Sequence, residues 1–146
     1  TEHSGVVEKI SIFYTYLVTF DNKQILIPNG ILTDSSIVNY SSKEIRRVDI
    51  TFSVSYEEDV IRVKNVLINI LKNNELVLEE PEFFVGISMH GDSAINFIVK
   101  AWCKTEDYWT VYYDLLETVK IKFDEEGISI PYPQMDLHVK KNIIID

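Results

Sequence analysis

The chain has 146 residues, of which 46% are hydrophobic and 25% are charged, and this composition favours a folded globular protein over a disordered one. Its formal net charge of −9 comes from 23 acidic and 14 basic side chains. Such a balance opposes an extended phosphate-binding surface, so nucleic acid is not expected as a partner.

Cysteine content and hydropathy limit the class of protein further. The single cysteine, Cys103, cannot form an internal disulfide, and its apolar surroundings predict a buried thiol in a reducing compartment. The longest apolar stretches, residues 10–20 and 94–103, contain polar residues and fall short of the ~20 residues that span a bilayer. The chain begins at Thr1 without a signal segment, and we expect it to be an internal piece of a longer protein.

The first 45 residues predict a small β-domain. Residues 6–20 alternate between apolar and polar side chains and predict two strands with a bend between them. Asp21-Asn22 predicts a tight turn into a third strand at residues 24–27, which Pro28-Asn29-Gly30 closes with residues suited to positive φ. With a further extended piece at residues 37–40, these short strands predict a β-barrel or sandwich.

A polar, unpatterned stretch at residues 41–44 marks the border to a second predicted domain, residues 46–131. Residues 48–54 alternate as a half-buried strand. Ser55 and Glu58 then have the spacing of a capping box, which predicts a helix from Tyr56. Its expected core stripe consists of Val60, Val63, Leu67 and Ile70 or Leu71.

The remainder of this domain predicts two strands, a helix and a last edge strand. Residues 83–87 and 94–103 alternate as strands on either side of a turn at His90-Gly91-Asp92. A helix capped by Thr105 and ended by Gly127 follows, and residues 128–130 offer the edge strand. The order β-α-β-β-α-β predicts a ferredoxin-like fold. The expected core stripe of this helix consists of Trp109, Tyr112, Leu116, Val119 and Phe123.

The C-terminal residues 132–146 predict a separate assembly element. Pro131 and Pro133 remove two backbone donors and favour an extended path that leaves the preceding sheet. The strand that follows has two alternating faces, so it is expected to pair with the same strand of other copies. One face consists of Met135, Leu137 and Val139, and the other of Asp136, His138 and Lys140.

No arrangement of residues points to catalysis, a metal or a cofactor. His3, His90 and His138 lack ligand partners at zinc-site spacing. The run His90-Gly91-Asp92-Ser93 contains residue types found in hydrolytic sites, but it falls in a turn, where they are expected for conformational reasons. The five glycines are dispersed, so no phosphate-binding loop is present.

The open face of a ferredoxin-like sheet is the surface that RNA-binding modules use. The residues expected there are Asp49, Thr51, Ser53, Asn96 and Lys100, rather than stacked aromatic side chains with basic neighbours. Trp102 and Phe84 are expected to pack against the first domain. RNA binding is therefore not predicted.

Several segments in a fixed order resemble the cytoplasmic region of small-conductance mechanosensitive channels of the MscS family. The resemblance covers nearly the whole chain. It is carried by Phe20-Asp-Asn-Lys, Ile25-Leu-Ile-Pro-Asn-Gly30, Arg46-Arg-Val-Asp49, Val54-Ser-Tyr56, Gly91-Asp-Ser-Ala-Ile-Asn96, Tyr112-Tyr-Asp-Leu-Leu-Glu117 and Ile130-Pro-Tyr-Pro-Gln-Met-Asp136.

This resemblance implies an Sm-like β-domain, an α/β domain and a C-terminal strand in a parallel β-barrel shared by seven identical subunits. It implies an inner-membrane channel without enzymatic activity, whose cytoplasmic cage passes ions and small solutes to the pore under osmotic stress. The membrane helices would precede Thr1. One face of residues 135–140 would line the barrel lumen. The alternative is a soluble ligand-sensing module that dimerises through its ferredoxin-like sheet.

Overall fold

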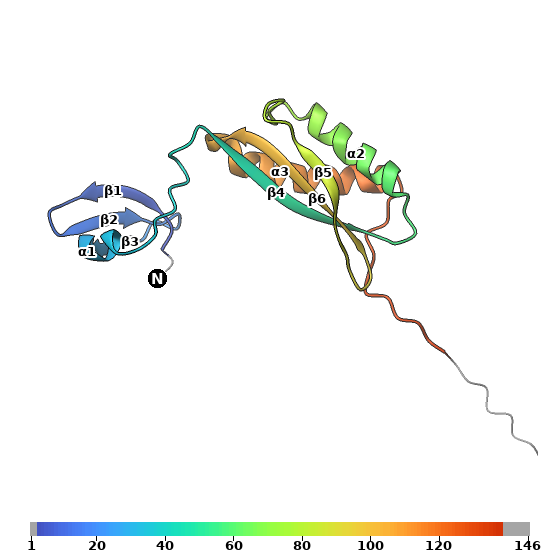
Figure 1. Ribbon diagram of the computed structural model, residues 1–146, viewed down its shortest axis with the longest axis horizontal. Coiled ribbons are helices and arrows are strands. Elements are labelled where there is room, and N and C mark those ends of the chain that lie inside the picture. The colour runs from blue at the N-terminus through green and yellow to red at the C-terminus, as the bar shows by residue number, and fades with distance from the viewer. Residues whose placement is uncertain (1–2, 139–146) are drawn as a thin grey trace, which may run out of the picture. The chain divides into compact units, whose positions relative to one another are not determined.

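The computed structural model describes residues 3–138, which fall into two compact units (Figure 1). Contacts divide the chain into Thr1–Tyr40 and Ser41–Asp146. Together the units have a mixed α and β composition with two antiparallel sheets. The domain ranges 1–45, 46–131 and 132–146 stay predictions.

The first unit is a three-stranded antiparallel sheet of order β1-β2-β3. The strands are β1 (Val6–Ile10), β2 (Tyr14–Val18) and β3 (Gln24–Pro28), so residues 6–20 form two strands as predicted. Asn22 has a φ of 63° in the turn before β3, a conformation that Asn tolerates better than most residues.

Two predictions for this unit are wrong. Gly30 does not adopt a positive φ, because β3 leads directly into the short helix α1 (Asn29–Thr33). Pro28 precedes this helix with a φ of −58°, which is a suitable approach to a helical turn. Residues 37–40 form no strand: pairing in this unit ends with β3, and Ile37 and Val38 are exposed.

The second unit packs two helices against one face of a three-stranded antiparallel sheet of order β4-β6-β5 (Figure 1). Its long helices contact each other as well as the sheet. The elements in chain order are β4 (Ile45–Val54), α2 (Val60–Asn73), β5 (Phe84–His90), β6 (Ile95–Lys104), a 3₁₀ turn at Thr105–Asp107 and α3 (Tyr108–Glu125).

The hydrophobic core lies between this sheet and its helices. The predicted apolar face of β6 is confirmed, since each of its members is at most 6% exposed. These residues are Ile95, Phe97, Val99, Ala101 and Cys103. Helix α2 contributes Val63, Leu67, Ile70 and Leu71, whereas Val60, at its first turn, is 36% exposed.

The predicted capping box is wrong. Helix α2 begins at Val60, and the Asp59 carboxylate caps it by accepting the amides of Ile61 and Arg62 at 2.8 and 3.0 Å. The Glu58 carboxylate is not available to Ser55, because its Oε1 accepts the backbone amide of Ser129 at 2.7 Å. A partner 71 residues along the chain has displaced the local one.

The start and stripe of the last helix also differ from the prediction. Thr105 does not cap α3; its hydroxyl donates to the backbone oxygen of Lys43 at 2.6 Å, and a 3₁₀ turn delays the helix to Tyr108. The helix buries Val111 and Leu115 rather than Trp109 and Leu116. The C-terminal part of the predicted core stripe, Val119 and Phe123, is confirmed.

The end of α3 is as predicted, but the edge strand after it is not. Gly127 has a φ of +66°, its amide donates to Asp124 O at 3.2 Å, and the Ile128 amide donates to Phe123 O at 2.8 Å. This is a Schellman motif. Residues 128–130 form no strand; a single backbone bond of 2.9 Å, from Ser55 to Ser129 O, joins them to the end of β4. Pro131, which has no amide proton, prevents the pairing from extending.

Candidate functional site

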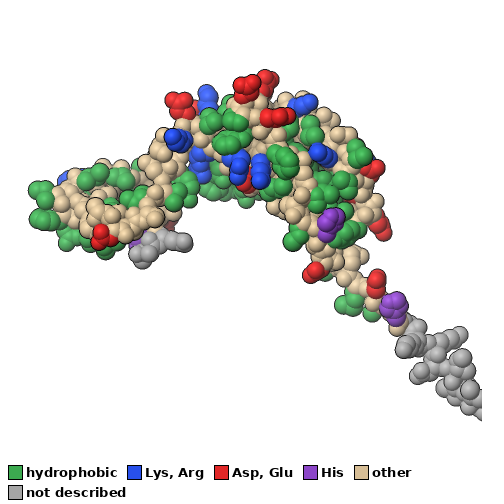
Figure 2. Space-filling model, in the orientation of Figure 1, with side chains coloured by type: hydrophobic (Ala, Val, Ile, Leu, Met, Phe, Trp, Pro, Cys, Tyr) green, Lys and Arg blue, Asp and Glu red, His purple; other side chains and the backbone are tan. Residues whose placement is uncertain are grey.

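None of the apolar side chains of the first unit is fully buried, and most of them are exposed. From His3 to Tyr40, the single buried residue is Thr15, so none of the buried core residues belongs to this unit. Figure 2 shows hydrophobic side chains over much of its visible surface. A sheet needs an apolar face packed against something to be stable in water, so these residues form a candidate assembly surface. Its most exposed members are Val6, Ile10, Ile12, Phe13, Phe20, Ile37 and Val38.

Asn29 holds this unit together by hydrogen bonds. Its side-chain amide donates to the backbone oxygens of Ser11 and Ile12 at 2.9 and 3.0 Å, and its backbone amide donates to Phe13 O at 2.9 Å. Its Oδ1 accepts the buried hydroxyl of Thr15 at 2.8 Å. The sequence pattern predicts a turn suited to positive φ at Asn29 and gives no signal for this role, which depends on partners in the β1–β2 turn.

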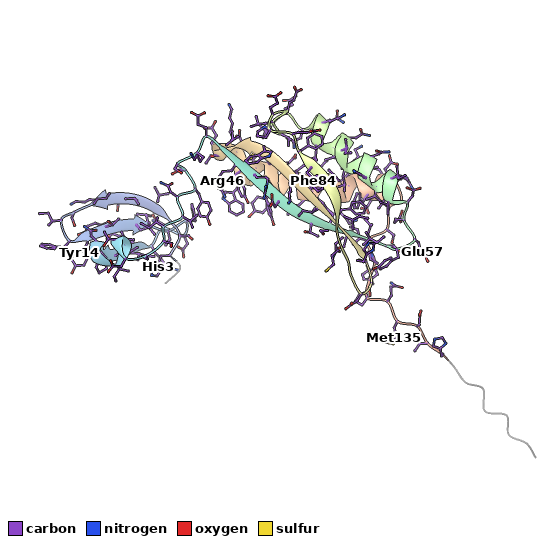
Figure 3. The ribbon with its side chains drawn as sticks, viewed as in Figure 1. His3, Tyr14, Arg46, Glu57, Phe84 and Met135 are labelled. Atoms are coloured by element: carbon purple, nitrogen blue, oxygen red, sulfur yellow. The ribbon has the colours of Figure 1, made fainter. Side chains whose placement is uncertain are left out.

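The open face of the β4-β6-β5 sheet bears two cation–π pairs. The Arg47 guanidinium lies 5.8 Å from the Trp102 ring centroid, and the Lys100 ammonium lies 5.9 Å from that of Phe84 (labelled in Figure 3). Arg47 also donates to both carboxylate oxygens of Asp49, at 2.7 and 2.9 Å, and this contact raises the pKa of Arg47. The prediction that this face lacks aromatic side chains with basic neighbours is therefore wrong.

The pairing register explains that miss. Arg47 lies opposite Trp102, and Lys100 lies opposite Phe84, so each basic residue acquires an aromatic neighbour from the adjacent strand. Alternation within one strand identifies the residues of a face but not their cross-strand partners.

Four aromatic side chains gather at the start of α3. Ring centroids of neighbouring members lie 5.1 to 5.8 Å apart. Trp109 and Tyr113 are 55% and 62% exposed and stack on each other, whereas Tyr108 accepts the Arg46 guanidinium over its ring at 3.8 Å. Exposed Trp and Tyr are enriched at protein interfaces. The cluster consists of Tyr108, Trp109, Tyr112 and Tyr113.

His90 is the last residue of β5, and Gly91 to Ala94 form the turn into β6, closed by the Gly91 amide on Ala94 O at 2.8 Å. The His90 ring stacks on Tyr56 at 6.4 Å, and the Tyr56 hydroxyl donates to Gly91 O at 2.6 Å. The Ser93 hydroxyl accepts the backbone amide of Gln134 at 3.1 Å. Within residues 3–138, no three His, Cys, Asp or Glu side chains lie close enough to hold a metal ion.

The predicted assembly strand is extended and exposed where the structure describes it. Met135 (Figure 3) and Leu137 are 82% and 80% exposed, and Asp136 and His138 are exposed as well. Residues 135–138 pair with no strand of the described chain. Val139 and Lys140 lie outside the described residues.

Comparisons with known proteins give these surfaces a context. Residues 48–130 match the family model described as "Mechanosensitive ion channel MscS, C-terminal", and residues 1–42 match "Mechanosensitive ion channel, beta-domain". The chain belongs to the MscS family of mechanosensitive ion channels. This MscS-family membership identifies it with a class of channels rather than a class of enzymes.

MscS-family relatives align over almost the whole chain. An uncharacterised MscS family protein of Buchnera aphidicola is 41% identical over 94% of this chain and 49% of its own length. A small-conductance mechanosensitive channel of Edwardsiella ictaluri is 38% identical over 93% of this chain and 48% of its own length. The chain therefore spans about half the length of these relatives.

A solved MscS structure has the same fold. The crystal structure of Helicobacter pylori MscS in its closed state aligns with a TM-score of 0.90 and 29% identity, over 94% of this chain and 55% of that one. No helix within residues 3–138 is long and apolar enough to cross a membrane.

Proposed function

We propose that this chain forms the cytoplasmic vestibule, or cage, of a homo-heptameric mechanosensitive channel of the inner membrane. In this proposal, ions and small solutes pass through the cage to a membrane pore that opens under hypo-osmotic stress. The membrane helices belong to a part of the protein outside residues 1–146. The family match and the span of about half of each relative support this assignment.

The observation that carries the proposal is the exposed apolar surface of the first unit. Between His3 and Tyr40 only Thr15 is buried, so the sheet β1-β2-β3 has no hydrophobic core of its own. Burying apolar area is worth roughly 25 cal/mol per Å², and contact between identical subunits would provide that burial. In the proposed ring this unit is an Sm-like β-domain whose sheet packs against the same domain of its neighbours.

The second unit and the terminal segment complete the proposed cage. The order β-α-β-β-α and the sheet order β4-β6-β5 support a ferredoxin-like domain. Residues 132–146 would supply one strand each to a parallel barrel. The exposed, unpaired course of residues 135–138 supports this role.

Sedimentation equilibrium of the chain tests the assembly. A mass of about seven chains is expected, and truncation before Met135 should weaken the ring while each protomer stays folded by circular dichroism. A stable dimer that binds a small molecule saturably would favour the ligand-sensing alternative instead.

Electrophysiology tests the activity. The full-length protein, reconstituted in liposomes, should conduct when suction is applied to a membrane patch. A correctly inserted protein that passes no current at any tension up to patch rupture would contradict the proposed function.

A further inference from the structure

The segment that leads into the terminal strand is anchored on both sides of its two prolines. Before Pro131, the Ser129 amide donates to Glu58 Oε1 at 2.7 Å, and Ser129 O accepts the Ser55 amide at 2.9 Å. After Pro133, the Gln134 amide donates to the Ser93 hydroxyl at 3.1 Å. The segment is thus held at points five residues apart in sequence, from Ser129 to Gln134.

The anchoring residues come from two loops that are bonded to each other. Ser55 and Glu58 lie in the connection from β4 to α2, and Ser93 lies in the turn from β5 to β6. The Tyr56 hydroxyl joins these loops by donating to Gly91 O at 2.6 Å. The two anchors are therefore parts of one structure rather than independent contacts.

The chain between the anchors has little freedom of its own. Pro131 and Pro133 each fix φ near −65° and restrict the residue before them to extended conformations. The side-chain amide of Gln134 donates to Tyr132 O at 2.9 Å, which spans the second proline. At its beginning, the segment is fixed by the Schellman motif that buries Ile128 to 3% exposure.

We propose that residues 128–134 form a rigid bracket that sets the direction in which the terminal strand leaves the domain. Glu58 and Ser93 are its positioning residues, because their side chains hold backbone amides that the local chain does not satisfy. The further claim, that this direction brings the terminal strands of neighbouring subunits into one barrel, rests on the proposed function. The bracket itself is a property of the single chain.

A distance measurement in the single chain tests the bracket. Spin labels are attached at Lys64→Cys, on the exposed face of α2, and at Leu137→Cys in the terminal strand. Pulsed electron paramagnetic resonance measures the distance between the two labels, which depends on the direction of the strand. Cys103 is fully buried and does not take up label in the folded protein. Labelled chain is diluted into excess unlabelled chain, so that each distance belongs to one molecule.

The wild-type distance distribution should be narrow, and combining Ser93→Ala with Glu58→Ala should widen it at least about twofold, since each anchor loses its side-chain acceptor. Ser93→Thr and Glu58→Gln keep an acceptor oxygen and should stay narrow. Ser88→Ala and Glu57→Ala are matched controls, because the Ser88 hydroxyl bonds Asn96 O and Glu57 is an exposed neighbour of Glu58. A broad wild-type distribution, or an unchanged one in the double variant, would overturn the bracket.

The sedimentation behaviour of the same variants links the bracket to assembly. A variant that widens the distance distribution should also weaken the ring, with a dissociation constant raised about tenfold. The thermal unfolding of the domain should stay unchanged. If the full-length protein passes no current at any tension up to patch rupture and the wild-type chain still gives a narrow distribution, the proposed function fails and the bracket stands. If the ring forms and the double variant neither widens the distribution nor weakens the ring, the bracket fails and the proposed function stands.

Discussion

The hydroxyl of Thr15 donates to Asn29 Oδ1 at 2.8 Å. Thr15 is the one buried residue between His3 and Tyr40. The unit is therefore ordered by a polar contact and by strand pairing, whereas none of its apolar side chains is fully buried. Asn29 also bonds the carbonyls of Ser11 and Ile12, so one amide side chain connects β2 to the turn before it.

Replacing Asn29 with alanine should loosen the first unit selectively. The change leaves the Thr15 hydroxyl buried without its acceptor and removes two bonds to backbone oxygens. The expected cost is about 1–3 kcal/mol of local stability. Amide hydrogen exchange should accelerate in β1 to β3 and stay unchanged in β4 to β6. Asn65→Ala, on the exposed face of α2, is the control; equal exchange in both variants would contradict this role for Asn29.

A second prediction concerns Gly127. Alanine there should destabilise the second unit by about 1–2 kcal/mol, because a residue with a Cβ is strained at its φ of +66°. Crowding does not contribute, since a Cβ at Gly127 would meet no atom within 4 Å. Gly30→Ala is a matched control: its Cβ would also meet open space, but its φ is not positive. Urea unfolding followed by far-ultraviolet circular dichroism, which reports on both units, measures both variants. An unchanged midpoint for Gly127→Ala would contradict the prediction.

These two positions illustrate what a sequence can specify. Gly127 was predicted correctly because a helix-ending glycine is a local signal. The apolar face of β6 was also predictable, since alternation over ten residues records one buried and one open side.

The failures involve residues whose partners are distant in sequence. The spacing of Ser55 and Glu58 fits a capping box, yet Ser129 takes the Glu58 carboxylate. Thr105 has the chemistry of a helix cap, yet its hydroxyl donates to Lys43 O. The spacing of aromatic residues in α3 suggested a buried stripe, but Trp109 is exposed among its neighbouring rings. For the terminal strand, the sequence pattern indicates two faces, and its partners belong to other chains in the proposed ring.

The buried thiol gives a pH-dependent prediction. Burial raises the pKa of Cys103, the charge of Asp107 raises it further, and Arg46 opposes them. In the unfolded chain the thiol ionises near its ordinary pKa of ~8.5, whereas in the folded protein it keeps the proton to a higher pH. Stability contributed by this group is therefore complete below pH ~8.5 and declines above it, by at most about 1.4 kcal/mol per pH unit.

Urea unfolding at several pH values between 8 and 10.5 isolates this effect. Cys103→Ala lowers stability at every pH because it leaves a small cavity, but it should remove the thiol's share of the pH slope. The difference in unfolding free energy between the wild type and the variant should therefore shrink as the pH rises. A difference that is constant over this range would show that the folded and unfolded thiols ionise alike.

The two faces of the terminal strand give the last prediction, which concerns permeation through the proposed cage. Alternation places Met135, Leu137 and Val139 on one face and Asp136, His138 and Lys140 on the other. In a barrel of such strands, one of these faces lines the lumen.

If the lumen face is the polar one, Asp136→Asn should shift the anion-to-cation preference of the full-length channel, because its charge is repeated in every subunit. Met135→Ala, on the opposite face, should instead weaken assembly. Current–voltage curves in asymmetric salt measure the preference, and unchanged preference and conductance after replacing either face would show that this strand does not line the permeation path.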